Sequence, residues 1–297
     1  AGGAFAGSGG SRLGLDANVS AGTADTLITG AATGSTSVDV ALIGPAIFNF
    51  GGVLVVDGEA GTSPTAFVLG SVSSGNPFID FGLVNVAAAN DFFLVANPGQ
   101  AVFETAVTGE MALNVWYESA DAVSSQLGTS RDNVPDHIGR LTTDSGFSGW
   151  AQLYVGEHRR DATQSFTGPG GTTLFDVGYE QQFDGFQGGL DYGTDSLTFG
   201  VTFGTVQSDA MYDASSNRLD MEAFNLGFYA SYADGGFYAN LIAKYDWLDA
   251  ESRPGSLSVE FDGSAYGVRA EAGYRFVLGR LYGEPAVAVS FVHLGLD

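Results

Sequence analysis

The histidines, the serines and the glycine-rich segments are the first places to look for chemistry in this sequence, and none of them forms a complete motif. The three histidines, His137, His158 and His293, lack the short mutual spacing of metal ligands. The segment Gly-Phe-Ser-Gly at 146–149 is one residue short of the pattern that exposes a nucleophilic serine. The segment Gly-Pro-Gly-Gly at 168–171 has no helix after it to complete a phosphate site. We therefore expect no catalytic residue, no cofactor and no metal ion in this sequence.

Charged side chains recur instead at every second position of strand-length stretches. In a β-strand successive side chains point to opposite faces, so one face of each stretch is polar and the other apolar. This two-residue alternation is clearest in segments 237–247 and 266–276. If the sheet closes around a lumen, the predicted lumen-facing residues are Asn240, Lys244, Asp246, Arg269, Glu271 and Arg275. The predicted lipid-facing residues are Phe237, Leu241, Tyr245, Val268 and Ala272.

The connections between these stretches alternate between long and short. Seven stretches lie between Gly149 and Val292, and polar segments at 161–173, 207–219 and 249–256 follow the first, third and fifth. Tight turns near 193–195, 233–236 and 277–280 follow the second, fourth and sixth. Antiparallel barrels of the outer membrane have short turns on one side and longer loops on the other. This alternation of long and short connections favours a membrane β-barrel over a soluble sheet. A soluble sheet would cover its apolar face with a second layer.

The composition narrows the possible functions. The 297 residues include no cysteine, 34 acidic and 11 basic residues, with a net charge of -23. Disulfides and thiolate metal sites are therefore excluded, and binding to nucleic acid is disfavoured because it relies on Lys and Arg. The sequence has no run of 18 or more apolar residues, so it predicts no helical membrane span. Its first residues do not resemble a signal peptide, and we expect the chain to be a fragment that lacks its start.

Residues 1–100 differ from the rest of the chain in residue composition and in the spacing of their strands. Short apolar strands recur there at intervals of very roughly 13 to 18 residues, from Asp25 to Val95. This spacing is typical of rungs of a parallel β-helix, in which each rung needs its neighbour to bury an apolar side. An ordinary small β-sandwich is the alternative.

One helix is predicted between the two regions, from Ala101 to Leu127, with Gly128 as its stop. At 1.5 Å per residue it would extend ~40 Å, long enough to thread a barrel. Alternatively, its first turns cap the β-helix. The polar segment from Thr129 to Gly146 is interpreted as a linker. The cluster Glu157-His158-Arg159-Arg160 is interpreted as a charge group at the rim of the lumen.

This order of parts resembles the classical autotransporters, the type V secretion family of Gram-negative bacteria. Segments 52–57, 66–70, 80–84 and 93–95 look like the end of a pertactin-like passenger, the part that acts as an autochaperone in the family. Segments 149–150, 185–191, 227–229, 236–238, 266–268 and 271–274 are similar to recurring patterns of the family's barrel.

The resemblance implies an all-β fold: the end of a right-handed parallel β-helix at 1–100, a linker helix and linker at 101–146, and a partial antiparallel transmembrane β-barrel at 147–297. It implies a translocator that anchors and exports its own passenger, located in the bacterial outer membrane with the passenger at the cell surface. The implied partners are outer-membrane lipid and lipopolysaccharide, the barrel assembly machinery and periplasmic chaperones, with no nucleic acid.

Two features depart from the family pattern. The segment after Gly149 has room for about seven of the family's twelve strands, and it ends at Asp297 without the usual C-terminal aromatic residue. The helix also lacks the paired asparagines at which one branch of the family cleaves its passenger. Two other classes stay open: a passenger that is an adhesin or a secreted hydrolase, and, with less support, a porin-type channel.

Overall fold

The computed structural model describes residues 2–132, 146–194, 196–278 and 281–297. Within them the chain divides into two compact units, one of residues 1–106 with 161–177 and the other of residues 107–160 with 178–297. The ranges expected from the sequence, 1–100, 101–146 and 147–297, therefore differ from the packing in one main respect. Residues 161–177, which lie inside the predicted barrel range, pack with the amino-terminal unit.

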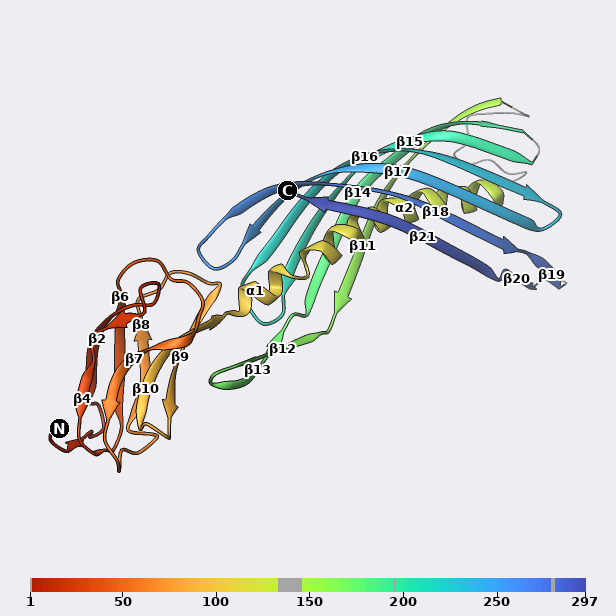
Figure 1. Cartoon of the computed structure of the whole chain (residues 1–297). Helices are drawn as coiled ribbons and strands as arrows, with labels where there is room; N and C mark the ends of the chain where they lie inside the picture. The colour runs from red at the N-terminus through yellow and green to blue at the C-terminus, as the bar shows by residue number, and fades with distance from the viewer. Residues whose placement is uncertain (1, 133–145, 195, 279–280) are drawn as a thin grey trace. The chain divides into compact units, whose positions relative to one another are not determined.

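The first unit contains two four-stranded sheets, with strand orders β3-β2-β6-β8 and β4-β7-β10-β9 (Figure 1). The pairs β1–β5, β2–β6, β6–β8 and β4–β7 are parallel, whereas β10 pairs antiparallel with both β7 and β9. Of the strands expected to be consecutive rungs, those from β4 to β9 belong to alternate sheets, whereas β9 and β10 are antiparallel neighbours in one sheet. The right-handed parallel β-helix stays a prediction. The elements are β1 Phe5–Ala6, β2 Arg12–Asn18, β3 Thr23–Ala24, β4 Leu27–Thr29, β5 Ala32–Thr33, β6 Thr36–Leu42, β7 Asn49–Gly58, β8 Phe67–Val72, β9 Ile79–Val86, β10 Asp91–Pro98, α1 Gln100–Thr105, β12 Thr163–Gly168 and β13 Gly171–Asp176.

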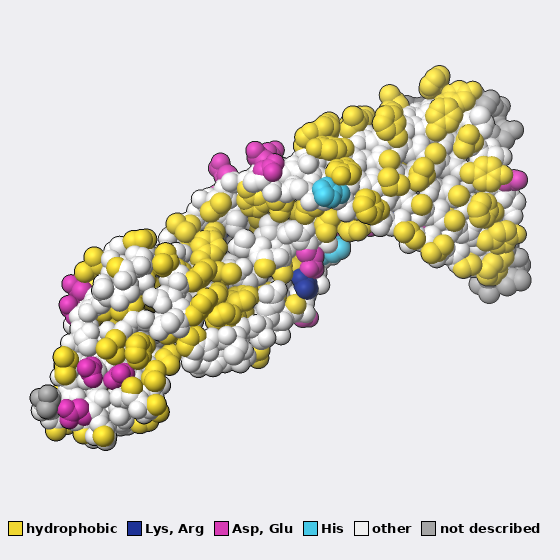
Figure 2. Space-filling model, viewed as in Figure 1, with side chains coloured by type: hydrophobic (Ala, Val, Ile, Leu, Met, Phe, Trp, Pro, Cys, Tyr) yellow, Lys and Arg dark blue, Asp and Glu magenta, His cyan; other side chains and the backbone are white. Residues whose placement is uncertain are grey.

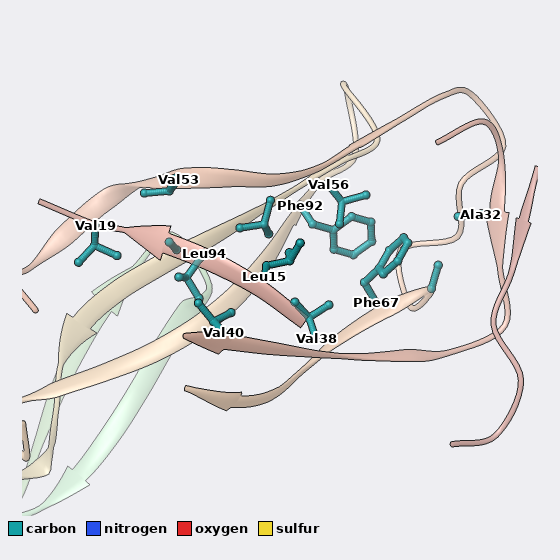
Figure 3. Close-up of a cluster of buried hydrophobic side chains, with 13 residues drawn as sticks. Leu15, Val19, Ala32, Val38, Val40, Val53, Val56, Phe67, Phe92 and Leu94 are labelled. Carbon is teal, nitrogen blue, oxygen red and sulfur yellow. The ribbon is translucent and has the colours of Figure 1, made fainter. Parts of the chain in front are cut away.

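The core of this unit lies between the two sheets. Side chains of Val38 and Val40 from β6 meet those of Val56 from β7 and Leu94 from β10, as Figure 3 shows. Phe67 packs edge-on against Phe92, with ring centroids 5.1 Å apart, and both side chains are buried. Because burial of such side chains is the main stabilising term, this cluster holds the two sheets together.

Side-chain hydrogen bonds of one carboxylate connect three parallel strands on the surface of the first sheet. Asp39 of β6 accepts a bond from Arg12 of β2 at 2.6 Å and from the Ser71 hydroxyl of β8 at 2.8 Å. The bond from Arg12 is the largest cause that lowers the pKa of Asp39 below its usual value, and the bond from Ser71 adds to it. The carboxylate therefore fixes the register of neighbouring strands.

The second unit is one seven-stranded antiparallel sheet, in the order β11-β14-β15-β16-β17-β18-β21, with one long helix along it (Figure 1). The seven predicted stretches are confirmed as strands of one antiparallel sheet. No described helix is both long and apolar enough to cross a membrane. The elements are α2 Thr108–Asp132, β11 Gly146–Arg160, β14 Tyr179–Gly193, β15 Leu197–Tyr212, β16 Arg218–Asp234, β17 Phe237–Arg253, β18 Val259–Tyr274, β19 Phe276–Leu278, β20 Leu281–Gly283 and β21 Ala286–Leu296.

The helix differs from its expected form. Instead of one helix from Ala101 to Leu127, α1 ends at Thr105 and α2 begins at Thr108, at the boundary between the compact units. The predicted stop at Gly128 is wrong, because α2 continues to Asp132. Gly is only modestly unfavourable inside a helix, and Arg131 in the last turn contacts Glu284 and the Tyr238 ring of β17. Most of the predicted linker, residues 133–145, lies outside the described residues.

The connections also differ from expectation. The segments 207–219 and 249–256, expected to be long loops, are largely strand, and only residues 213–217 and 254–258 connect the strands. Their polar residues continue the alternation of the strands into paired extensions, as between Asp209 and Asp220. The tight turn expected at 277–280 is part of the β19–β20 hairpin, although residues 279–280 lie outside the described part.

Candidate functional site

The candidate site is the interface between α2 and one face of the seven-stranded sheet. The helix contacts all seven strands of the sheet. Along β15, β16 and β17 every second side chain is buried, and those between them are mostly exposed. The face that meets α2 carries polar and small side chains beside apolar ones such as Ile242, so the helix is held by hydrogen bonds and ion pairs as well as by packing.

Lys244 is at the centre of this interface. Its ammonium group donates to both carboxylate oxygens of Asp246, at 2.6 and 2.7 Å, and to the Ser119 hydroxyl of α2 at 2.6 Å. It also lies 4.8 Å from the centre of the Trp116 ring. The Lys244 and Asp246 side chains are fully buried. A buried charge is tolerated only when it is paired and hydrogen-bonded, so the position of α2 completes this site.

Glycines on the neighbouring strands leave room for these groups. Gly227 and Gly267 are the cross-strand neighbours of Lys244. A Cβ atom at Gly267 would lie 2.8 Å from the Trp116 ring, and one at Gly227 would lie 2.7 Å from Cβ of Lys244. The glycine-rich inner face therefore lets the helix and the lysine approach the sheet backbone.

The first half of α2 is held mainly by side-chain amides. Gln181 of β14 donates to the backbone carbonyl of Met111 at 3.0 Å and to the Ser208 hydroxyl at 2.8 Å. Asn114 donates to the side-chain carbonyl of Gln181 at 3.0 Å and to the Tyr179 hydroxyl at 3.2 Å. Gln181 is fully buried, which makes this network specific for one placement of the helix.

The charged cluster 157–160 divides between the two faces of β11. His158 lies 2.9 Å from a carboxylate oxygen of Glu118, and Arg160 pairs with Glu110, so both reach α2. Glu157 and Arg159 alternate with them and are exposed. The cluster therefore contributes to the helix interface rather than to an active site.

The last turn of α2 is fixed by an arginine-rich group. Arg131 donates to Glu284 at 2.7 Å and lies over the Tyr238 ring, 3.6 Å from its centre. Arg275 donates to the other oxygen of Glu284 at 2.5 Å. One carboxylate therefore links the helix end to the residue that follows β18.

The structure brings several predicted lumen-facing residues to this interface. Asn240, Lys244 and Asp246 are buried on the face that α2 covers. Arg269 pairs with Asp121 of α2 at 2.5 Å, and Glu271 is partly exposed. Arg269 and Arg275 thus have acidic partners on other elements, Asp121 and Glu284.

The opposite face of the sheet is apolar and exposed. Phe237, Leu241, Tyr245 and Val268 are between 36% and 48% exposed, and Ala272 is partly exposed. Figure 2 shows hydrophobic side chains spread over the sheet on the side in view, with few charged groups among them. Contact of this face with lipid stays a prediction that its chemistry favours.

A row of carboxylates bounds this apolar face. Asp184, Glu222, Asp249 and Asp262 all lie in one cross-strand row, with Gln207 between the first two. On β17 the apolar face extends from Phe237 to Trp247, and Asp249 follows directly. Ten residue steps of ~3.3 Å, at a strand tilt of ~40°, give a height of about 25 Å, the height of the apolar band of an outer-membrane barrel.

The residues first tested for catalysis have structural partners. Ser148 lies in β11 and donates to Asp191, which accepts a further bond from Tyr229 at 2.8 Å. His293 packs against the Tyr266 ring, with centroids 5.0 Å apart. His137 lies outside the described residues. The glycines at 168–171 form the turn of the β12–β13 hairpin.

Sequence reasoning missed the groups of α2 that complete the interface. Ser119 and Trp116 are three residues apart on one face of the helix and are fully buried. A serine and a tryptophan on the apolar stripe of an otherwise amphipathic helix could have indicated a polar partner there. Nothing local to α2 in the sequence indicates that this partner is Lys244, 125 residues away.

Residues 149–297 match the sequence model of the family described as Autotransporter beta-domain. A solved structure, the β domain of the Bordetella autotransporter BrkA, is similar with 21% sequence identity and a TM-score of 0.40. The match covers 50% of this chain and 59% of that one, so this chain spans somewhat more than half of that domain. A search of curated proteins found no match.

Proposed function

Because this chain belongs to the autotransporter β-domain family, we propose that it is a translocator joined to the end of its own passenger. Membership of the family implies that residues 149–297 lie in the bacterial outer membrane. In this proposal, the sheet is part of a barrel whose polar face lines a lumen and whose apolar face meets lipid. The single observation that supports it most is the burial of Lys244 between Asp246 and Ser119 of α2.

The proposed mechanism uses the helix as the last segment to cross. The passenger passes through the lumen unfolded, and α2 then remains inside, where its contacts with the wall close the pore. The charged and amide contacts at Lys244, Gln181 and Arg131 are complete only when the helix is seated. They supply a defined end point for export. A chain without cysteine suits this route, because a disulfide formed in the periplasm would have to pass the lumen.

The passenger end is the first unit. Its parallel pairs join residues 25 to 32 apart, as in Arg12↔Ser37 and Val40↔Val72. These offsets support turns of a right-handed parallel β-helix that is pertactin-like, with its last turns acting as an autochaperone at the cell surface. Folding there, after emergence, makes export directional without enzymatic turnover.

The proposed export across the outer membrane implies which molecules this protein contacts. In the outer membrane they are lipid on the inner side and lipopolysaccharide on the outer side, the latter near the exposed Glu157 and Arg159. During assembly they are periplasmic chaperones and the barrel assembly machinery.

The test is the conductance of the complete protein in planar bilayers. Deleting residues 112–127 removes the Ser119 and Trp116 contacts and should open a large-conductance pore, while the natural protein stays closed. Barrel amount, judged by heat-modifiable migration in gels, is the control. Equal conductance with and without the segment would show that α2 does not close the barrel.

A further inference from the structure

The hairpin of β12 and β13 belongs to the sequence of the β domain but to the fold of the amino-terminal unit. Residues 163–176 lie within the segment that matches the family, between β11 and β14 of the seven-stranded sheet. The two strands pair from Thr163↔Asp176 to Gly168↔Gly171. Nevertheless, residues 161–177 form a compact unit with residues 1–106. The connection is therefore more than a solvent-exposed loop.

Four phenylalanines join the hairpin to the rest of this unit. Phe175 of β13 stacks on Phe103 of α1, with ring centroids 4.2 Å apart and an angle of 18°. Phe166 of β12 lies 5.7 Å from Phe50 of β7 and 6.4 Å from Phe103. Phe175 is 7% exposed. These rings bring together three elements that are remote in the sequence.

One polar contact at the open end of the hairpin and two close approaches at its turn continue this interface. The Gln100 side chain donates to the backbone carbonyl of Asp176 at 2.5 Å. At the turn, a Cβ atom at Gly168 would lie 3.1 Å from the side-chain oxygen of Asn97, and one at Gly170 would lie 3.6 Å from Val84. The hairpin therefore lies along the end of the unit formed by β9, β10 and α1.

The buried side chains of the hairpin allow one of its faces to contact the rest of the unit, while the other face is exposed. In β12, Gln164 and Phe166 are partly buried, while Thr163, Ser165 and Thr167 are exposed. In β13, Phe175 is buried, whereas its neighbour Leu174 is 71% exposed. The alternation in β12 and the single buried side chain of β13 suit a strand pair that covers an apolar surface on one side and faces water on the other.

Neither partner is expected to be ordered alone. An isolated two-stranded hairpin is marginally stable at best, and a helix of six residues such as α1 is too short to persist by itself. The contacts at Phe103 and Phe175 stabilise both. Order in the hairpin and order in residues 97–105 are therefore coupled.

We propose that the β12–β13 hairpin is a docking arm of the β domain for the folded carboxyl-terminal end of its own passenger. Its partner is the surface of β7, β9, β10 and α1, and the contact is aromatic. Resting on the proposed export function, the arm would give residues 49–105 a template on which to fold when they emerge, and would hold them afterwards. This role is separate from closure of the lumen by α2.

The experiment uses the complete protein in the outer membrane of a Gram-negative host. Phe175→Ala and Phe103→Ala each remove one ring of the stacked pair, and Leu174→Ala is the matched control on the exposed side of β13. The rate of protease cleavage within residues 49–105 on intact cells is measured, together with surface labelling of an amino-terminal epitope and heat-modifiable migration of the barrel. We expect each Phe variant to be cleaved about tenfold faster or more, and Leu174→Ala to behave as the natural protein.

Coupling between the rings gives a second measurement. If the rings act through each other, Phe103→Ala adds less than about twofold to the cleavage rate when Phe175 is already alanine. Should Phe175→Ala prevent barrel assembly, Phe103→Ala, which lies outside the β domain, must still show faster cleavage. Cleavage of Phe103→Ala and Phe175→Ala at the rate of Leu174→Ala would overturn the docking arm, and independent additive effects would overturn the stacked contact as its basis. Absence of the epitope from the surface of cells with the natural protein would instead refute the export function.

Discussion

Replacing Lys244 by methionine should release α2 from the sheet. Methionine keeps most of the length of the side chain but removes the charge that Asp246 and Ser119 contact. Asp246, which is fully buried, would then be a charge without its partner. Removing one member of a buried ion pair typically costs about 3–5 kcal/mol. At about 1.4 kcal/mol per factor of ten, the equilibrium for seating the helix should fall roughly a hundredfold to a few thousandfold.

A second variant separates the ion pair from the packing around it. Lys244→Met combined with Asp246→Leu removes both charges and fills a similar volume, so its cost should be below about 2 kcal/mol. Leu241→Met, on the exposed apolar face of the same strand, is the control for effects of a substitution on barrel assembly and purification. The order expected for helix stability is control and natural protein first, double variant next, and Lys244→Met last.

The Trp116 ring makes the change measurable. It is fully buried beside Lys244 in the seated state, so its fluorescence should shift to longer wavelength when α2 leaves the sheet. Urea titration of the purified complete protein in detergent gives the midpoint for each variant. A double variant as unstable as Lys244→Met, or a Lys244→Met variant within about 0.5 kcal/mol of the control, would refute the role given to the buried pair.

Three further predictions address other parts of the chain. Phe67→Ala should destabilise the first unit by about 3–5 kcal/mol, whereas Val68→Ala, at an exposed position, should cost below about 1 kcal/mol; equal urea midpoints for the two would contradict the core. Gly267→Ala should weaken the seating of α2 by about 1–3 kcal/mol, because its Cβ would crowd both the backbone oxygen of Phe291 and the Trp116 ring, while Gly295→Ala meets no neighbour within 4 Å and should be neutral; conductance of the two variants tests this. The pKa of Asp39 is lowered in the folded state mainly by its bond from Arg12, so its stabilising effect is present above the ordinary carboxyl pKa of about 3.9 and is lost as pH falls below it. In Arg12→Gln most of this acid sensitivity should disappear, and NMR titration of Asp39 that gives the same pKa with and without Arg12 would count against it.

The seven-stranded sheet was predictable because its strands repeat one local rule. In β17 and β18 the alternation of apolar and polar residues is written in consecutive residues, so no distant contact is needed to infer the faces. At 207–219 and 249–256 the polar composition predicts loops, whereas the structure has mostly strand. Asp209 and Asp220 pair across β15 and β16 beyond the apolar face. The two-residue alternation continues there with the opposite polarity, because the outward side chains are polar while Leu219 and Met221 are buried.

Features that depend on contacts between distant residues were not predictable. The break between α1 and α2 at residues 106–107 contains no Gly or Pro, and it falls where the chain changes from one packing unit to the other. The docking of Phe175 on Phe103 joins positions 72 residues apart, and nothing in either local pattern specifies the other. The contact between Ser119 and Lys244 has the same character.

The carboxylate row marks the level at which the outer face of the sheet changes from apolar to charged. Asp184, Glu222, Asp249 and Asp262 are on four different strands but at one level. If the apolar face meets lipid as proposed, a shift of the sheet by one residue pair toward the membrane would move all four carboxylates toward the hydrocarbon together. A shift in the opposite direction would move Phe, Tyr and Trp side chains of the apolar face into water. In that case the carboxylate row and the apolar side chains would fix the depth of the sheet in the membrane from both directions.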